Sequence, residues 1–123
     1  FSGRGKTDIY LAVPGAEVLV AECKLWEGMV YHLDALQQLF GYLQWSQNFG
    51  LLLVFNKKDS LTGLVRQSYE ALRQQPTALA DHGCVLDERH HTTTHRHPVD
   101  EEKTLEVHTI FINLRSTDRR STL

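Results

Sequence analysis

Apolar and polar residues alternate along two short stretches near the start of the chain. In residues 6–13 one face carries Ile9, Leu11 and Val13, and the other carries Asp8, Tyr10 and Ala12. A second apolar run, VLVAECKLW, covers residues 18–26, and Pro14-Gly15 between the runs is a strong turn signal. This spacing predicts two neighbouring antiparallel strands.

The period changes after the second run. Between residues 32 and 48, apolar side chains recur every three or four positions, which predicts a helix with one buried stripe: Leu33, Leu36, Phe40 and Leu43. Residues 50–57 are continuously apolar, as expected of a strand covered on both faces. Residues 60–75 form a second amphipathic pattern, with Ser60 as a possible cap and Pro76 after its end. The expected inward side of this helix carries Leu61, Leu64, Val65, Tyr69 and Leu72.

The last third of the chain is β-prone. Residues 83–97 and 103–114 flank PVDEE, which indicates a hairpin, and residues 116–123 form a polar tail. We therefore expect an α/β fold, a mixed β-sheet flanked by helices with a C-terminal β-hairpin, over residues 1–115.

Composition narrows the class of protein. The chain has 123 residues, 41% hydrophobic and 23% charged, which suits one domain with a real core. It contains no run of roughly 20 apolar residues and no signal-peptide pattern, so we expect a cytoplasmic protein without membrane contact. Cys23 and Cys84 lack metal-type spacing, and Cys23 is expected to be a reduced core thiol. The net charge of −2 argues against non-specific coating of nucleic acid but permits a local basic site.

Two charges interrupt the apolar run at residues 18–26. Glu22 and Lys24 are separated by one residue, so on a strand they share a face, and the predicted hairpin brings Asp8 beside them. Two carboxylates at close range repel unless a positive charge joins them. Oxygen ligands suit a magnesium ion, and a lysine beside such an ion can hold the attacking water or stabilise charge on a phosphate. We expect this strand to be buried on its Cys23 face and catalytic on its Glu22/Lys24 face.

These residues resemble the PD-(D/E)XK nuclease superfamily, which has the restriction-endonuclease-like fold. The resemblance rests on Asp8, thirteen intervening residues, and then Glu22-Cys23-Lys24. In DALQQLFGYL, Gln38 and Tyr42 match the Q-x-x-x-Y motif of RecB-like nuclease domains, and on a helix they lie one turn apart, roughly opposite the apolar stripe. The phrases GRGKTDIYL, ECKLWEG, QLFGYLQW and RHPVD are similar to nuclease domains of larger bacterial defence or restriction-type proteins.

The resemblance implies a magnesium-dependent deoxyribonuclease, with manganese as a possible substitute. Asp8, Glu22 and the backbone carbonyl of Cys23 would hold the metal, Lys24 would position the attacking water or help deprotonate it, and Gln38 and Tyr42 would orient substrate or lysine. DNA and the remainder of a larger parent protein are the implied partners, and a homodimer is a further option. The pattern fits either endonuclease or exonuclease action.

One feature of the superfamily has no counterpart here. Many members carry a further acidic residue on a helix before the first strand, and this chain begins at Phe1 about where that helix would end. We therefore expect a fragment that lacks its first helix and can be inactive alone. A non-catalytic module that keeps the fold to bind nucleic acid or a partner protein is the alternative.

Two further groups of residues carry candidate chemistry. Within residues 90–97, His91, His95 and His97 would share one strand face with His90 on the other, so they could bind zinc, although we expect a solvated hairpin face. Trp26 and Trp45 are expected in core or interface packing rather than base stacking. Basic residues near the ends of the core strands are candidates for phosphate contacts: Arg4, Lys6, Lys57, Lys58 and Arg66.

Overall fold

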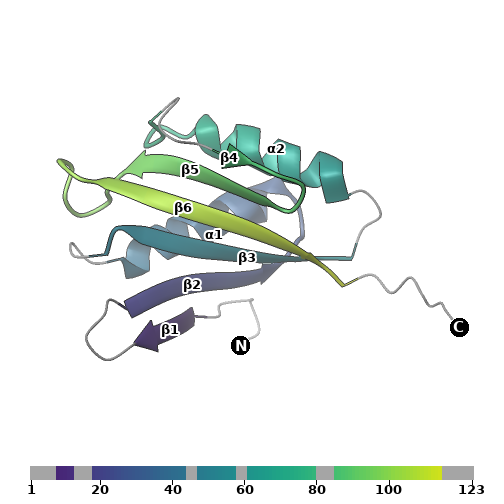
Figure 1. Cartoon of the computed structure of the whole chain (residues 1–123), viewed down its shortest axis with the longest axis horizontal. Coiled ribbons are helices and arrows are strands. Elements are labelled where there is room, and N and C mark those ends of the chain that lie inside the picture. The colour runs from purple at the N-terminus through teal and green to yellow at the C-terminus, as the bar shows by residue number, and fades with distance from the viewer. Residues whose placement is uncertain (1–7, 13–17, 44–46, 58–60, 80–84, 115–123) are drawn as a thin grey trace, which may run out of the picture.

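The computed structural model describes residues 8–12, 18–43, 47–57, 61–79 and 85–114, with side chains from Val20 onward. Six strands form one sheet in the order β1-β2-β3-β6-β5-β4, with helices α1 and α2 packed against it (Figure 1). The expected α/β class with a mixed sheet is therefore confirmed. The tail at residues 116–123 lies outside the described residues, as do Ser60, Trp45 and Cys84.

The elements follow the predicted order with small changes at their ends. The strands are β1 (Asp8–Ala12), β2 (Val18–Leu25), β3 (Phe49–Asn56), β4 (Val85–Leu86), β5 (His90–Arg96) and β6 (Thr104–Asn113). The helices are α1 (Met29–Tyr42) and α2 (Leu61–Arg73). Helix α1 begins earlier than predicted, directly after Gly28, whose φ of 109° is a conformation that glycine adopts without strain.

Both expected hairpins are present. Strands β1 and β2 are antiparallel, and so are β5 and β6, whereas β2–β3 and β3–β6 are parallel. Helix α1 makes the crossover between β2 and β3, and α2 lies in the longer connection between β3 and β6. The sheet is thus mixed because a parallel centre joins two antiparallel edges.

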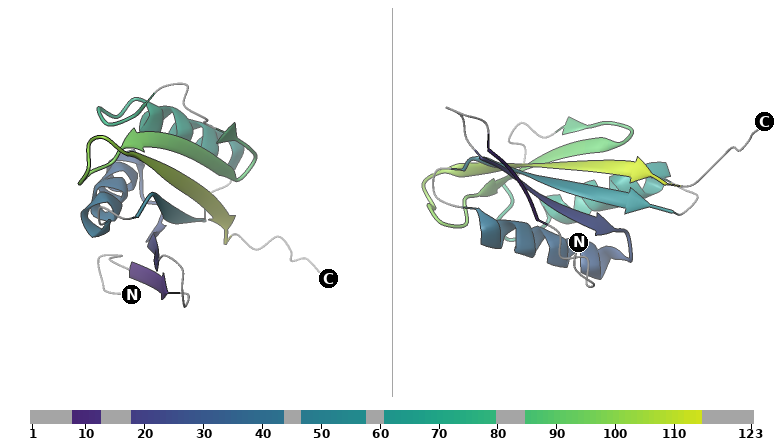
Figure 2. Two further views of the ribbon diagram at one scale, coloured as in Figure 1. Left: turned by 60° about the vertical axis from the view of Figure 1, so that its left-hand side comes forward. Right: turned by 90° about the horizontal axis from the view of Figure 1, so that it is seen from below.

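Both helices cover one face of the sheet (Figure 2). A methyl group added at Gly50 of β3 would meet the side chain of Leu39 in α1, and Ser68 of α2 bonds to His91 of β5. Gly50 of β3 pairs with Val107 of β6, and Val107 pairs with Thr93 of β5, so these three residues share one face of the sheet. His91 lies two residues from Thr93 on β5 and therefore belongs to the same face. The core between helices and sheet contains Val20, Leu36, Leu39, Phe40, Leu52, Leu72, Leu105 and Val107.

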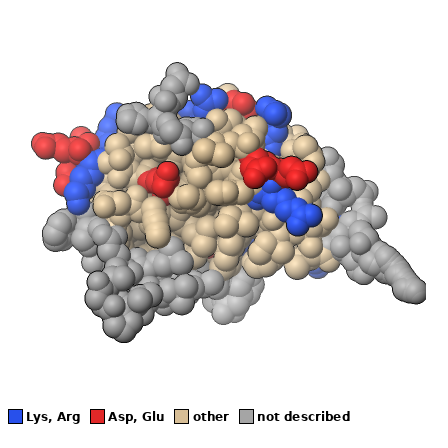
Figure 3. Space-filling model, viewed as in Figure 1, with Lys and Arg blue, Asp and Glu red and all other residues tan. Residues whose placement is uncertain are grey.

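The opposite face of the sheet has no helix among the described residues. On β3, residues 50, 52, 54 and 56 are buried, whereas Leu51, Leu53 and Phe55 are only half-buried. The expectation that this strand is fully covered on both faces is therefore wrong for one face. Viewed from this side, uncharged residues occupy most of the described surface (Figure 3).

Close packing at Gly50 gives a test of the α1–sheet contact. A Cβ at this position would lie 3.0 Å from Leu39 Cδ2 and 3.1 Å from Cδ1, and Leu39 is wholly buried. We expect Gly50→Ala to lower the free energy of unfolding by about 1 kcal/mol, because overpacking outweighs the gain in backbone rigidity. Urea denaturation measures this, and in a Leu39→Ala background the same substitution should be neutral or stabilising. An equal loss in both backgrounds would place the cause elsewhere.

Candidate active site

The hairpin register brings residues 8 and 22 together, as the sequence predicts. Asp8 is the direct partner of Glu22 across the antiparallel β1–β2 pair. Directly opposed positions of such a pair belong to the same face of the sheet, with Cβ positions about 5 Å apart. The side chain of Asp8 is not among those described. The structure therefore gives the position of Asp8 in the strand register but no contact of its carboxylate.

Glu22 and Lys24 lie on the helix-covered face. Glu22 is partner to Leu52 and Lys24 to Val54, and both partners belong to the buried side of β3. The Glu22 side chain is 0% exposed and the Lys24 side chain 16% exposed, with Lys24 Nζ 3.6 Å from Glu22 Oε2. The Glu22/Lys24 face is expected to be catalytic, and the structure buries the Glu22 carboxylate on it beneath the helices.

Cys23 points to the other face and is also buried, at 6% exposure. Burial, and then the negative charge of Glu22, raise the pKa of its thiol, so the sulfur stays protonated near neutral pH. The expectation of a reduced core thiol is confirmed, since Cys23 is free.

At the end that carries Lys24, strand β2 has a described neighbouring strand on one side alone. Strand β1 pairs with residues 18–22, so within the described residues Cys23, Lys24 and Leu25 have only β3 beside them. Just beyond, a hollow of about 620 Å³ is lined by Leu25, Trp26, Glu27, Gly28 and Lys57. The exposed Lys57 thus lies near the same end of β2 as Lys24.

A magnesium ion would find oxygen donors of the right type here. Glu22 supplies a buried carboxylate, the register supplies Asp8, and the Cys23 carbonyl lies between Glu22 and Lys24. Hard oxygen ligands are what magnesium requires, so the donor set fits. Among side chains that the structure describes, which exclude Asp8, no three His, Cys, Asp or Glu residues are grouped as a metal site.

The helix pair predicted to complete the site has a different environment from the one expected. Gln38 donates a hydrogen bond from Nε2 to Asp34 Oδ2 at 3.2 Å, and its Oε1 is buried with no hydrogen-bond partner among the described residues. Tyr42 is half-buried and packs against the core that contains Leu36 and Phe40. The prediction that both lie opposite the apolar stripe is therefore wrong for Tyr42.

Tyr42→Phe separates the hydroxyl from the packed ring. We expect it to lower the free energy of unfolding by no more than about 1 kcal/mol, because the ring stays in the core and one hydrogen bond is lost at most. Tyr42→Ala should cost clearly more, since it also removes the ring. Thermal melts and a cleavage assay measure both variants, and equal destabilisation by the two would contradict the packing of the Tyr42 ring against the core.

Of the remaining basic candidates, the structure describes one. Arg66 is exposed on α2, whereas Arg4, Lys6 and Lys58 lie outside the described residues. Trp26 packs against His32 and Phe111, with ring centroids 5.1 and 6.4 Å apart, so the expected core packing is confirmed for this residue.

The histidine run is a buried structural feature rather than a solvated face. His91, His95 and His97 are at most 1% exposed. Their ring nitrogens bond to different groups: His91 to Ser68, His95 to Thr77 and Thr93, and His97 to the Gln47 carbonyl and the amides of Val99 and Asp100. They form no common metal site. Both the solvated face and the shared zinc site are therefore wrong.

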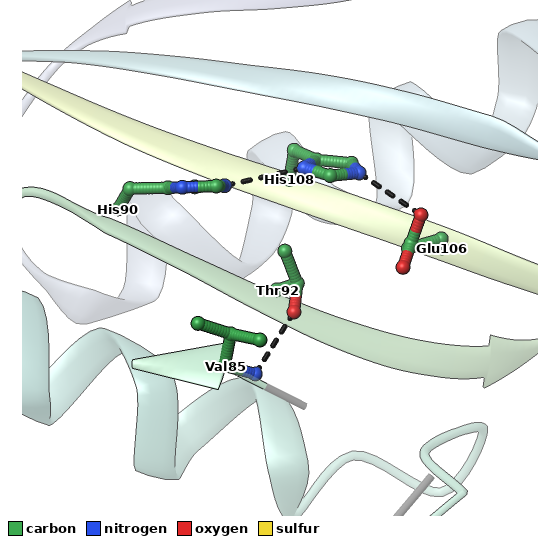
Figure 4. A network of polar contacts seen from close by, with 5 residues as sticks. All are labelled: Val85, His90, Thr92, Glu106 and His108. Carbon is green, nitrogen blue, oxygen red and sulfur yellow. Dashed lines mark hydrogen bonds and ion pairs between the residues drawn. The ribbon is translucent and has the colours of Figure 1, made fainter. Parts of the chain in front are cut away.

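His90 points to the opposite face, as predicted. It forms a polar network with His108 and Glu106 (Figure 4). His108 Nε2–H donates to Glu106 Oε1 at 3.0 Å, which leaves His108 Nδ1 to accept from His90 Nε2–H at 3.2 Å.

Sequence reasoning missed Ser68 and His32, which bond to each other in the core, where Ser68 also bonds to His91. Both lie on the inward side of their helices, at positions that a strict apolar stripe omits. The only available signal was their helical spacing from apolar neighbours, since Ser68 follows Leu64 by four and His32 precedes Leu36 by four.

Comparison with known proteins adds no relative. No family model, curated protein or solved structure matches the chain. Neither helix of the described residues combines the length and apolar character needed to cross a membrane.

Proposed function

We propose that this chain is a metal-dependent nuclease domain with a restriction-endonuclease-like fold that hydrolyses phosphodiester bonds in DNA. The observation that carries the proposal is the register of Asp8 with Glu22, next to Lys24 on the same face. The resemblance of Asp8, Glu22-Cys23-Lys24 and Gln38/Tyr42 to the superfamily motifs supports it. A β1–β2 hairpin followed by a helix and a parallel strand is the arrangement that the resemblance implies.

Each residue then has a definite task. Asp8, Glu22 and the Cys23 carbonyl would hold magnesium, which supplies Lewis-acid activation of the phosphate and of water. Lys24, with its ammonium 3.6 Å from Glu22, would hold the attacking water or balance negative charge on the phosphate. Gln38 Oε1 is a buried acceptor without a described partner, so it could orient Lys24 or substrate. Lys57 would contact a flanking phosphate at the hollow beyond β2.

The alternative is a non-catalytic module of the same fold. Complete burial of Glu22 beside Lys24 favours it, because a purely structural ion pair would have this geometry too. Such a module would bind DNA or a partner protein without magnesium-dependent cleavage.

The deciding experiment has two readouts. The chain is incubated with supercoiled and linear DNA in magnesium, manganese or EDTA, and magnesium binding is measured separately by calorimetry. Cleavage that needs metal, is lost in Lys24→Ala and persists in Lys103→Ala supports the nuclease. Absence of both cleavage and magnesium binding overturns it and leaves the non-catalytic module.

A further inference from the structure

A single hydroxyl joins three elements of the fold. Ser68 Oγ of α2 lies 2.6 Å from His32 Nε2 of α1 and 2.8 Å from His91 Nε2 of β5. These side chains are 0–3% exposed. We call this His32–Ser68–His91 chain the latch, because α1, α2 and β5 meet there through hydrogen bonds.

The hydrogen-bonding capacity of Ser68 fixes where the hydrogens of the latch lie. A hydroxyl has one hydrogen, so Ser68 can donate to one imidazole and must accept from the other. His91 Nδ1 is buried with no hydrogen-bond partner among the described residues. An unpaired lone pair costs less than an unpaired N–H, so His91 carries its hydrogen on Nε2 and donates to Ser68. Ser68 then donates to His32 Nε2, and both imidazoles are neutral.

An added proton breaks this arrangement at either end. On His32 Nε2 it removes the acceptor for the Ser68 hydroxyl. On His91 Nδ1 it creates a buried N–H without an acceptor. Burial lowers the pKa of His32 to about 4. Burial, followed by repulsion from His32, His90 and His95, lowers the pKa of His91 to about 3.

No carboxylate among the described side chains bonds to either imidazole of the latch. Tyr69 of α2 meets His91 edge-on at 5.5 Å, and the Arg73 guanidinium lies over the Tyr69 ring. Phe111 of β6 lies near both imidazoles, and the Trp26 ring packs against His32 at a tilt of 51°. Glu22 lies in register with His91 across the sheet, but Leu52 of β3 and Thr109 of β6 lie between them.

A second buried imidazole holds the segment after α2. His95 Nδ1 bonds to Thr77 Oγ1 at 3.0 Å, and the backbone at 77–79 pairs with β5 through Arg96 N–H to Thr77 O and Leu79 N–H to Thr94 O. Burial lowers the pKa of His95 to about 4. Among the described residues, β2, β3 and β6 place no histidine on the helix-covered face. Within the helix-covered face, protonation of strand histidines therefore acts at β5 and not at the β2–β3–β6 centre.

We propose that the latch makes α2 an acid-releasable element: protonation of His32 and His91 detaches α2 and residues 77–79 from β5 before the β2–β3–β6 centre opens. Release exposes the inward side of α2, with Leu64, Val65 and Leu72, and the β5 face beneath it. The inference stands independently of the proposed nuclease function.

Hydrogen exchange measured by mass spectrometry between pH 7 and pH 4, corrected for the intrinsic pH dependence of exchange, tests the proposal on the whole chain. Peptides from α2 and β5 should lose protection below about pH 5.5, while peptides from β2 and β3 keep theirs to lower pH. His91→Gln should move this midpoint down by about half a pH unit or more, because its amide can still donate to Ser68 but does not titrate. His90→Gln, at the adjacent residue on the opposite face, should move the midpoint clearly less than His91→Gln does, because it removes only the minor repulsion that His90 adds at His91.

Two outcomes would overturn the proposal: simultaneous loss of protection in all strands, or equal midpoints for His91→Gln and His90→Gln. If His91→Gln does not fold, imidazole NMR of the wild type gives the answer. His32 and His91 should stay neutral until the α2 amides exchange. Free titration near pH 6.5 with α2 still protected would show that no latch exists.

Discussion

Glu22→Gln should abolish magnesium-dependent cleavage without unfolding the protein. The substitution keeps the shape of a side chain that is wholly buried, but it removes the charge opposite Asp8 that a cation would need. In EDTA we expect a melting temperature equal to that of the wild type or slightly higher, because repulsion between the two carboxylates is relieved. Lys24 retains 16% exposure and can keep its ammonium hydrated once Glu22 is neutral.

Two matched variants divide the proposed roles. Asp8→Asn should behave like Glu22→Gln, with no cleavage and weakened magnesium binding. Lys24→Ala should lose turnover while keeping most of the magnesium affinity, since it removes no oxygen ligand. Magnesium should raise the melting temperature of the wild type and of Lys24→Ala, but not that of the two carboxylate variants.

The opposite pattern identifies a structural ion pair. Removing one member of a buried pair costs about 3–5 kcal/mol when the other charge stays buried. If Glu22→Gln is destabilised to that extent in EDTA, and magnesium shifts no melting curve, the carboxylates are not a metal site and the nuclease proposal fails.

Acid should destabilise the whole domain steeply. His32, His91 and His95 have pKa values lowered to about 4, 3 and 4, against about 6.5 in the unfolded chain. Between these values the unfolded chain binds more protons, so stability is complete above pH 6.5 and is lost as the pH falls towards 4. Each histidine contributes up to about 1.4 kcal/mol per pH unit, and together they should remove roughly 5 kcal/mol between pH 7 and pH 5.

That loss is comparable with the total stability of many domains, which is about 5–15 kcal/mol. Urea denaturation at pH 7 and pH 5 measures it, and His90→Gln serves as the control because His90 is only half-buried. A free energy of unfolding that changes by less than about 1 kcal/mol over this range would mean that the three imidazoles are protonated in the folded state.

Local patterns predicted most of the fold. Alternation and the Pro14-Gly15 signal placed β1 against β2, and the same hairpin logic brought Asp8 opposite Glu22. These predictions succeeded because strand pairing across a short turn depends on neighbouring residues alone. Helix α2 was predicted with its inward residues Leu64, Val65 and Leu72 because its apolar stripe is regular.

The errors concern which face of a strand the helices cover. His91 was expected on a solvated face and Glu22 on a catalytic one, and both side chains are fully buried. The position of α1 and α2 over one face depends on contacts between distant elements, and a strand's own alternation does not contain that information. His91 is tolerated there because Ser68, on α2, supplies a hydrogen-bond partner.

The parallel contact between β3 and β6 has a consequence for how the chain folds. It pairs residue 49 with residue 106, so the centre of the sheet joins the β1–β2–α1–β3 half to the half that begins with α2. The chain between residues 49 and 106 must close into a loop before the β3–β6 pairing can stabilise the fold, so formation of this pair is a slow folding step. Until then β3 presents GLLLVF as an unpaired apolar edge, a sequence suited to pairing with another copy. Refolding yield should therefore fall as the protein concentration rises. By pairing with β3, strand β6 from the second half of the chain protects the first half from aggregation.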